Sequence, residues 1–182
     1  MVIIMVPWML VYFEGFNLGS KHYPKEVAYY NISTCESGFF YVNLGEELWL
    51  SLPKSVQKVF HWKTANLHNL GWNSYPKGNV SIDYIEHWLG FISQFNQVCA
   101  LNAEQARYLA DTGLINVYCV SDVLQLPEID LRGSVSCGYL HHRSNQKHCA
   151  YSRVLMYGQF LTKSIGPGGS PSKSDDTETK EV

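Results

Sequence analysis

The N-terminal residues 1–13 are almost entirely apolar and are rich in β-branched and aromatic side chains. A continuous apolar run of this kind is typical of a central strand that is buried on both faces. The run is shorter than the roughly 20 residues that a membrane-spanning helix needs, and Pro7 interrupts it. No Lys or Arg precedes it and no small-residue cleavage site follows it. We therefore expect a buried strand rather than a signal sequence or a membrane anchor.

Residues 25–32 and 38–43 are rich in Tyr, Phe and Val, and turn-forming residues flank both segments. Together with the first run they predict three strands joined by short turns, an antiparallel meander. Further strands are predicted at 98–101 and 115–120, and helices at 55–63, 81–95, 103–111 and 147–162. The clearest helix follows Ser81, because apolar residues recur there at spacings of three and four.

Strands that alternate with helices after an antiparallel start predict an α/β fold, a mixed sheet with helices on its faces. Residues 66–80 contain Gly and Pro breakers and predict a loop long enough to be functional. Residues 166–182 have no large apolar side chain before the final Val. We therefore expect one domain over residues 1–165 and a disordered polar tail over 166–182.

Composition excludes one class of function. The chain has 182 residues, with 14 basic and 16 acidic side chains, so it has no overall basic footprint for binding nucleic acid by bulk charge. Its five cysteines are an odd number and make a disulfide framework improbable on compositional grounds. We expect an intracellular protein, cytoplasmic or nuclear, with no membrane association and with some thiols bound to a metal.

The candidate metal ligands lie near the C-terminal end of the body: Cys137, His141, His142, His148 and Cys149. Pairs of Cys and His separated by a loop are typical of zinc sites. Neighbouring residues on a helix point about 100° apart, so His148 and Cys149 are not expected to bind the same ion. We assign Cys149 to the metal and expect the His148 side chain to point away from it. The dipole of a helix N-terminus would favour the Cys149 thiolate. The alternative is a surface loop with chance histidines and a buried cysteine.

Glu14 is the candidate for a fourth ligand, because it stands at the end of the first predicted strand. Strand alternation places Tyr12 and Glu14 on one face, with Val11 and Phe13 on the other. A carboxylate that ends a buried strand is costly unless it is paired or bound to a cation. The alternative is that Glu14 lies just beyond the strand and is solvated.

Four short motifs carry a family resemblance. They are Glu-Gly-Phe at 14–16, Lys-Glu-Val-Ala at 25–28, the segment 62–72, and the pattern that runs from Cys137 to His148-Cys149-Ala150. Together they resemble a degenerate ribonuclease H-like domain of the DEDDh exonuclease lineage, specifically the Maelstrom type with its Glu-Cys-His-Cys zinc site. The resemblance covers roughly residues 3–161. It implies a mixed sheet with a three-strand antiparallel start, then parallel strands, flanked by helices.

Active members of that lineage hold two divalent ions on four carboxylates, so the matching positions are informative. Tyr12, Ala106 and Arg153 stand where three of the carboxylates are expected. Glu14 alone cannot hold two Mg²⁺ ions against a phosphate. The resemblance therefore implies that the two-metal magnesium site is absent.

The resemblance implies a closed, structural zinc site in its place, with ligands Glu14, Cys137, His141 and Cys149. The spacing between Cys and His departs from the family pattern, and this affects the choice of the third ligand. The family pattern has two residues between Cys and His, and here there are three. The choice among His141, His142 and neither therefore stays open.

The resulting functional hypothesis is a noncatalytic domain that binds RNA or single-stranded nucleic acid with moderate to weak affinity. Its candidate contacts are Lys63, His68, Trp72, Lys77 and, on a phosphate, Arg153. Alternatively, Trp62 and Trp72 anchor the core. A second hypothesis is a ribonuclease or 3′–5′ exonuclease of unorthodox mechanism, with His148 as general acid or base. A third is a protein-interaction scaffold with protein partners.

Overall fold

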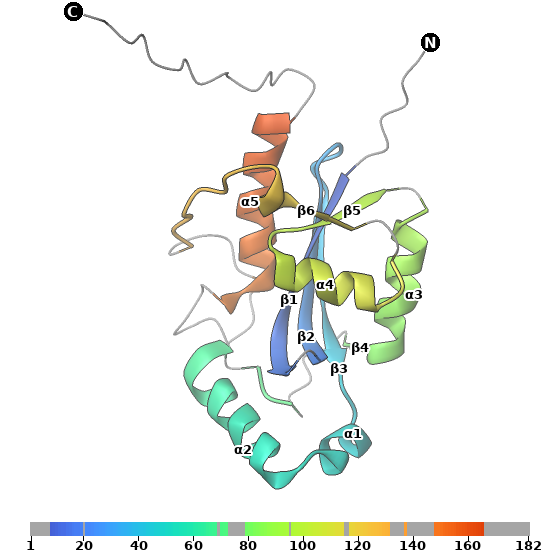
Figure 1. Cartoon of the computed structure of the whole chain (residues 1–182), viewed down its shortest axis with the longest axis vertical. Coiled ribbons are helices and arrows are strands. Elements are labelled where there is room, and N and C mark those ends of the chain that lie inside the picture. The colour runs from blue at the N-terminus through green and yellow to red at the C-terminus, as the bar shows by residue number, and fades with distance from the viewer. Residues whose placement is uncertain are drawn as a thin grey trace, which may run out of the picture.

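A mixed sheet forms the centre of the molecule (Figure 1). The computed structural model describes residues 8–19, 21–68, 70–72, 79–94, 96–114, 117–131, 137 and 148–165. The strands are β1 (Trp8–Leu18), β2 (Lys21–Asn31), β3 (Ser37–Asn43), β4 (Val80–Ser81), β5 (Gln97–Ala100) and β6 (Val117–Cys119). They lie in the order β4-β3-β2-β1-β5-β6. β1, β2 and β3 are antiparallel neighbours, whereas β5 joins β1 and β6 joins β5 in parallel. The predicted α/β fold class is therefore confirmed.

Helices cover both faces of the sheet (Figure 1). They are α1 (Glu46–Ser51), α2 (Lys54–Lys63), α3 (Ile82–Ile92), α4 (Ala103–Asp111) and α5 (Ala150–Ile165), with a π-helical turn η1 (Thr64–His68) and a 3₁₀ turn η2 (Val120–Asp122). Alternation along β1 divides the core as the sequence predicts. Val11 and Phe13 pack with α2, α3 and α4, whereas Leu10 and Tyr12 pack with α5. The sheet thus presents Tyr12 and its neighbours to α5.

The helix predicted at 103–111 is confirmed at both ends. Its start is fixed by Asn102, whose side chain accepts a hydrogen bond from the Gln105 backbone N–H at 3.0 Å. The helix predicted at 81–95 is α3, which ends at Ile92. The helix predicted at 147–162 is α5, which begins at Ala150 and extends to Ile165. The sequence pattern missed the short elements α1 and β4.

The predicted loop at 66–80 is in part a structural element. Its first residues belong to η1, and Trp72 stacks on Phe60 in the core. The buried Lys25 ammonium donates to the Trp72 carbonyl at 3.0 Å, and the Trp72 indole N–H donates to the Gly45 carbonyl at 3.0 Å. Burial lowers the Lys25 pKa to about 8. Residues 73–78 lie outside the described residues.

Two predicted segments at the ends of the chain also lie outside the described residues: positions 1–7 of the first strand and the polar tail at 166–182. Among the helices that are described, none has both the length and the apolar character needed to cross a bilayer.

Helix α5 approaches the sheet closely at Gly158. A Cβ atom added at this glycine would overlap the ring of Tyr30 on β2. One turn later, the Thr162 hydroxyl contacts the Tyr30 hydroxyl at 3.5 Å and donates to the Ile32 carbonyl at 3.4 Å. Gly158 therefore sets the distance between the helix and the sheet, and with it the position of the helix start.

A pair of glycine substitutions tests this packing. Gly158→Ala should lower the free energy of unfolding by about 1–3 kcal/mol, because the overlap with Tyr30 outweighs the better helix propensity of alanine. Gly90→Ala on α3 should instead raise it by about 0.5–1 kcal/mol, because a Cβ there meets no described atom within 4 Å. Urea denaturation followed by circular dichroism measures both. Equal stabilisation by the two substitutions would contradict the close approach.

Candidate functional site

Three potential metal ligands meet where α5 begins. Glu26 on β2, Cys137 and Cys149 each offer one ligand atom, and these atoms all lie within 4.8 Å of one another. The Cys149 Sγ is 3.7 Å from the Glu26 Oε1. Glu26 and Cys149 are fully buried and Cys137 is half-buried. We call these three residues the Glu-Cys-Cys cluster.

The local structure explains why the cluster assembles. Cys149 immediately precedes α5, and the Ser152 backbone N–H donates to its Sγ at 3.3 Å. The Ala150 N–H, also at the start of the helix, donates to the Glu26 Oε2 at 3.2 Å. The Tyr41 hydroxyl on β3 donates to the Cys137 Sγ at 2.8 Å. The positive end of the α5 dipole therefore points at the cluster and favours negative charge there.

Burial raises the pKa of the Glu26 carboxyl well above its ordinary value, and the nearby Cys149 raises it further. Hydrogen bonds from the backbone of α5 oppose this shift. The pKa of the Cys137 thiol is also raised, first by its hydrogen bond with Cys149 and then by burial. The protein alone therefore favours protonated ligands. A bound divalent cation would reverse that preference, because its own charge becomes the largest in the site.

The donor set fits zinc. Thiolate sulfur and carboxylate oxygen are both zinc ligands, whereas Mg²⁺ prefers oxygen alone. Ordinary Zn–S and Zn–O lengths with tetrahedral angles place sulfur and oxygen about 3.6 Å apart. The observed separation between Cys149 and Glu26 is 3.7 Å. The predicted histidine ligand, His141, and its alternative His142 lie outside the described residues.

The carboxylate in the cluster is not the one that the sequence predicts. The sequence predicts Glu14 as the ligand, whereas the residue that meets the two thiols is Glu26. Glu14 and Glu26 are direct partners in the antiparallel β1–β2 pair and so share a face. Glu14 instead directs its Oε2 to the His148 Nδ1, at 3.7 Å. The signal for Glu26 was present, since an acid inside the apolar strand 25–32 is as costly as one at a strand end.

A second polar group, the Tyr12–Arg153 pair, adjoins the cluster on the same face. The guanidinium of Arg153 on α5 lies over the Tyr12 ring, 5.0 Å from its centroid. Burial raises the Tyr12 pKa to about 12, with Arg153 opposing and the carboxylates of Glu14 and Glu104 adding to the shift. Ala106 packs against the core on the other face. Two of the three positions that lack an expected carboxylate, Tyr12 and Arg153, are thus in contact.

Two of the predicted nucleic-acid contacts are buried. His68 is 2% exposed and Trp72 is 4% exposed, so neither ring can stack on a base in this conformation. His68 lies edge-on to Phe16, and burial lowers its pKa to about 4. Lys63 is half-buried, and its ammonium donates to the Asn17 carbonyl at 3.4 Å. Lys77 lies outside the described residues.

The alternative prediction was that Trp62 and Trp72 both anchor the core. It is confirmed for Trp72 and wrong for Trp62, which is 58% exposed. The three thiols outside the cluster differ in burial. Cys99 is buried, Cys119 is half-buried and Cys35 is exposed in a turn with a φ of 61°. All five cysteines are among the described residues, and none forms a disulfide.

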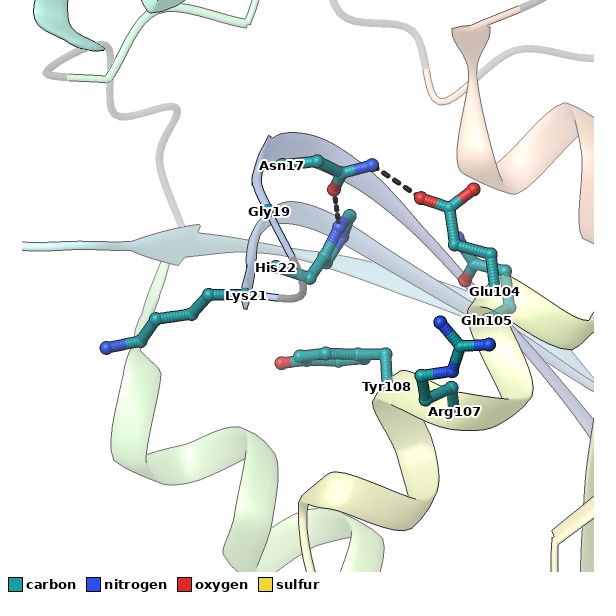
Figure 2. Close-up of a pocket in the computed structure, with 8 residues that line it drawn as sticks. All are labelled: Asn17, Gly19, Lys21, His22, Glu104, Gln105, Arg107 and Tyr108. Carbon is teal, nitrogen blue, oxygen red and sulfur yellow. Dashed lines mark hydrogen bonds between the residues drawn. The ribbon is translucent and has the colours of Figure 1, made fainter.

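A separate cavity of about 180 Å³ lies at the tip of the β1–β2 hairpin, against the start of α4 (Figure 2). The Asn17 side-chain amide donates to the Glu104 carboxylate at 2.6 Å, and its oxygen contacts the His22 Nδ1. Burial, with a smaller effect of Lys63, lowers the His22 pKa to about 4. The imidazole is therefore neutral at pH 7 and donates from Nδ1 to Asn17. These contacts fasten the hairpin to α4.

No protein-family model, curated protein or solved structure was found to match this chain.

The cluster predicts which carboxylate holds the metal. Purified protein should contain stoichiometric zinc, and Glu26→Gln or Cys149→Ser should remove most of it, because each deletes an anionic ligand. Glu14→Gln is the matched control on the opposite strand and should retain the zinc. Elemental analysis of the three variants and the parent after dialysis measures the outcome. If Glu26→Gln retained the zinc and Glu14→Gln lost it, Glu14 would be the carboxylate ligand instead.

Proposed function

We propose that the chain is a noncatalytic ribonuclease H-like domain that binds RNA or another single-stranded nucleic acid and carries a structural zinc. The observation that carries the proposal is the position of Arg153 over Tyr12, beside the Glu-Cys-Cys cluster. A cation thus stands where the exonuclease resemblance expects a metal-binding carboxylate. A fixed guanidinium can bind a phosphate without any metal ion.

The fold supports this proposal. Its sheet has an antiparallel three-strand start followed by parallel strands, with helices on both faces, which is the arrangement that the resemblance implies. The two thiols of the cluster support the Maelstrom-type form of the resemblance, because they stand at the Cys positions of its Glu-Cys-His-Cys site; the carboxylate beside them is Glu26 rather than Glu14. A histidine of the segment 141–142 would complete four protein ligands. Four protein ligands make a closed site, and a closed zinc site is structural.

The side chains on this face argue against two-metal catalysis. Two divalent ions need several carboxylates, and the matching positions hold Tyr12, Ala106 and Arg153. Glu14 is the one acid present among the four carboxylate positions that the resemblance expects, and it faces His148. When bound, zinc would join β2, the start of α5 and the Cys137 segment into one unit. It would thereby hold Arg153 in place, because Arg153 lies one helical turn beyond Cys149 and donates its backbone N–H to the Cys149 carbonyl at 3.1 Å.

Arg153→Ala tests the phosphate contact. Single-stranded RNA should bind more weakly to this variant. The slope of log affinity against log salt concentration should fall by about 0.7, the value for one lost phosphate contact. Lys163→Ala, an exposed basic residue near the end of α5, is the matched control and should bind as the parent does. Fluorescence anisotropy at several salt concentrations measures the slope. Equal slopes for parent and Arg153→Ala would remove Arg153 from the interface.

A second function is favoured by one specific observation, the 3.7 Å separation between the Glu14 Oε2 and the His148 Nδ1. A carboxylate beside one ring nitrogen orients the imidazole and leaves Nε2 available to accept a proton. RNA carries its own nucleophile. The 2′-oxygen would attack phosphorus and lose its proton to His148, while the bond from phosphorus to the 5′-oxygen breaks and that oxygen takes a proton from water. The reaction requires no metal ion.

Cleavage assays decide between binding alone and this second function. If the second function holds, the protein cuts single-stranded RNA in the presence of a chelator and leaves DNA of the same sequence intact. His148→Ala should abolish that cleavage, and Glu14→Gln should slow it, because the imidazole loses its orienting group. His87→Ala, an exposed histidine on α3, is the control and should cut normally. Absence of cleavage by the parent would exclude the second function and leave the binding proposal unaffected.

A further inference from the structure

The charges of the chain are unevenly distributed. Residues 48–82 contain no Asp or Glu, yet they contain four lysines and two histidines. The whole chain has a net charge of −2, so the rest of it is acidic by comparison. Within this stretch the structure describes α2, which lies at one end of the molecule, beyond the tip of the sheet (Figure 1).

Helix α2 has one buried side and one exposed basic side. Phe60 and Gln57 are buried against the body. Lys54, Lys58 and Trp62 follow one another at intervals of four residues, so they form a single stripe along the helix. All three side chains are exposed, and Trp62 is 58% exposed. No carboxylate among the described residues forms an ion pair with either lysine.

We propose that this stripe of Lys54, Lys58 and Trp62 is the surface on which a single-stranded nucleic acid lies. The inference rests on the proposed function and names the part of the surface that performs it. The two ammonium groups would contact successive phosphates, and one base would stack on the indole of Trp62. Stacking on an aromatic side chain and contacts to phosphates are the usual means of binding single strands without sequence preference.

The stripe leads towards the Tyr12–Arg153 pair. At the end of α2, Lys63 contacts the Asn17 carbonyl at the end of β1. The chain then turns through η1 to His68, which is close enough to His148 for the charge of His148 to lower the His68 pKa further. His148 in turn faces Glu14. The end of α2 is therefore connected through Lys63, His68 and His148 to the face of the sheet that carries Glu14.

A lipid surface would also attract lysines beside a tryptophan, but α2 is poorly suited to it. Amphipathic helices bind membranes by inserting an apolar face into the bilayer. The apolar face of α2, which includes Phe60, already packs in the core. Only Val59 and Trp62 remain as large exposed apolar side chains on this helix. A single indole beside two lysines suits one stacked base next to phosphates better than it suits acyl chains.

The structure also offers a matched negative control. Helix α3 exposes Phe91, which is 61% exposed, but its charged side chains are the acids Asp83 and Glu86. Carboxylates repel phosphate, so an exposed aromatic side chain alone should not bind a nucleic acid there. Phe91→Ala therefore separates the effect of losing an exposed aromatic ring from the effect of losing the basic stripe.

The experiment measures fluorescence anisotropy of a short labelled oligouridine with the full chain. Trp62→Ala should bind about tenfold more weakly, the effect of one lost base stack. The double variant Lys54→Ala/Lys58→Ala should lower the slope of log affinity against log salt by about 1.4, for two lost phosphate contacts. Phe91→Ala should bind as the parent does. Because all four side chains are exposed, unfolding midpoints should stay close to that of the parent.

The outcomes separate this inference from the function on which it rests. If the parent binds and the α2 variants bind equally well, the stripe is not the surface and the proposed function stands. If Arg153→Ala alone weakens binding, the contact is confined to that face and the stripe is again excluded. If the parent binds no oligouridine, both proposals fail. Binding to anionic phospholipid vesicles that Trp62→Ala abolishes, without oligouridine binding, would overturn the inference in favour of a membrane contact.

Discussion

The arrangement of the site depends on one buried carboxylate, Glu26. Removing such a charge from water costs several kcal/mol unless partners compensate for it. The partners that favour the ionised carboxylate here are backbone N–H groups at the N-terminus of α5, that of Ala150 among them. Because these contacts fix where α5 begins, they also fix the positions of the side chains along the helix. Arg153 reaches Tyr12 one turn later, and His148, just before the helix, reaches Glu14.

Glu26 also makes negative charge costly on this face of the sheet. Glu14 lies directly opposite it across the β1–β2 pair, and like charges at such positions destabilise a sheet. The charge of Glu14 accordingly contributes to the raised pKa of Glu26. His148 beside Glu14, and a metal ion at the Glu-Cys-Cys cluster, would each reduce this repulsion. The cluster and the Glu14–His148 pair are therefore coupled electrostatically, although their side chains have different partners.

The sequence predicted the elements better than the contacts between them. Strand alternation placed Tyr12 and Glu14 on one face, and a capping Asn102 marked the start of α4, because both are local effects. The choice between Glu14 and Glu26 depended on which thiols come close, and this is set by strand pairing and by the start of α5. Pairing of distant segments also explains Trp72. Its segment contains breakers typical of a loop, yet hydrogen bonds with Lys25 and Gly45 hold it in the core.

The net charge of the whole chain is a poor guide to whether one part of its surface can bind a nucleic acid. A polyanion responds to the charges within about a Debye length, roughly 8 Å at physiological ionic strength, rather than to the sum over the chain. The acids of this protein are absent from residues 48–82, so the lysines on α2 have no acidic residue within their own stretch of the sequence. Few phosphates can be contacted by so narrow a stripe. Its affinity would consequently depend as much on stacking at Trp62 as on charge, so a neutral composition is compatible with a weak, localised contact with single-stranded nucleic acid.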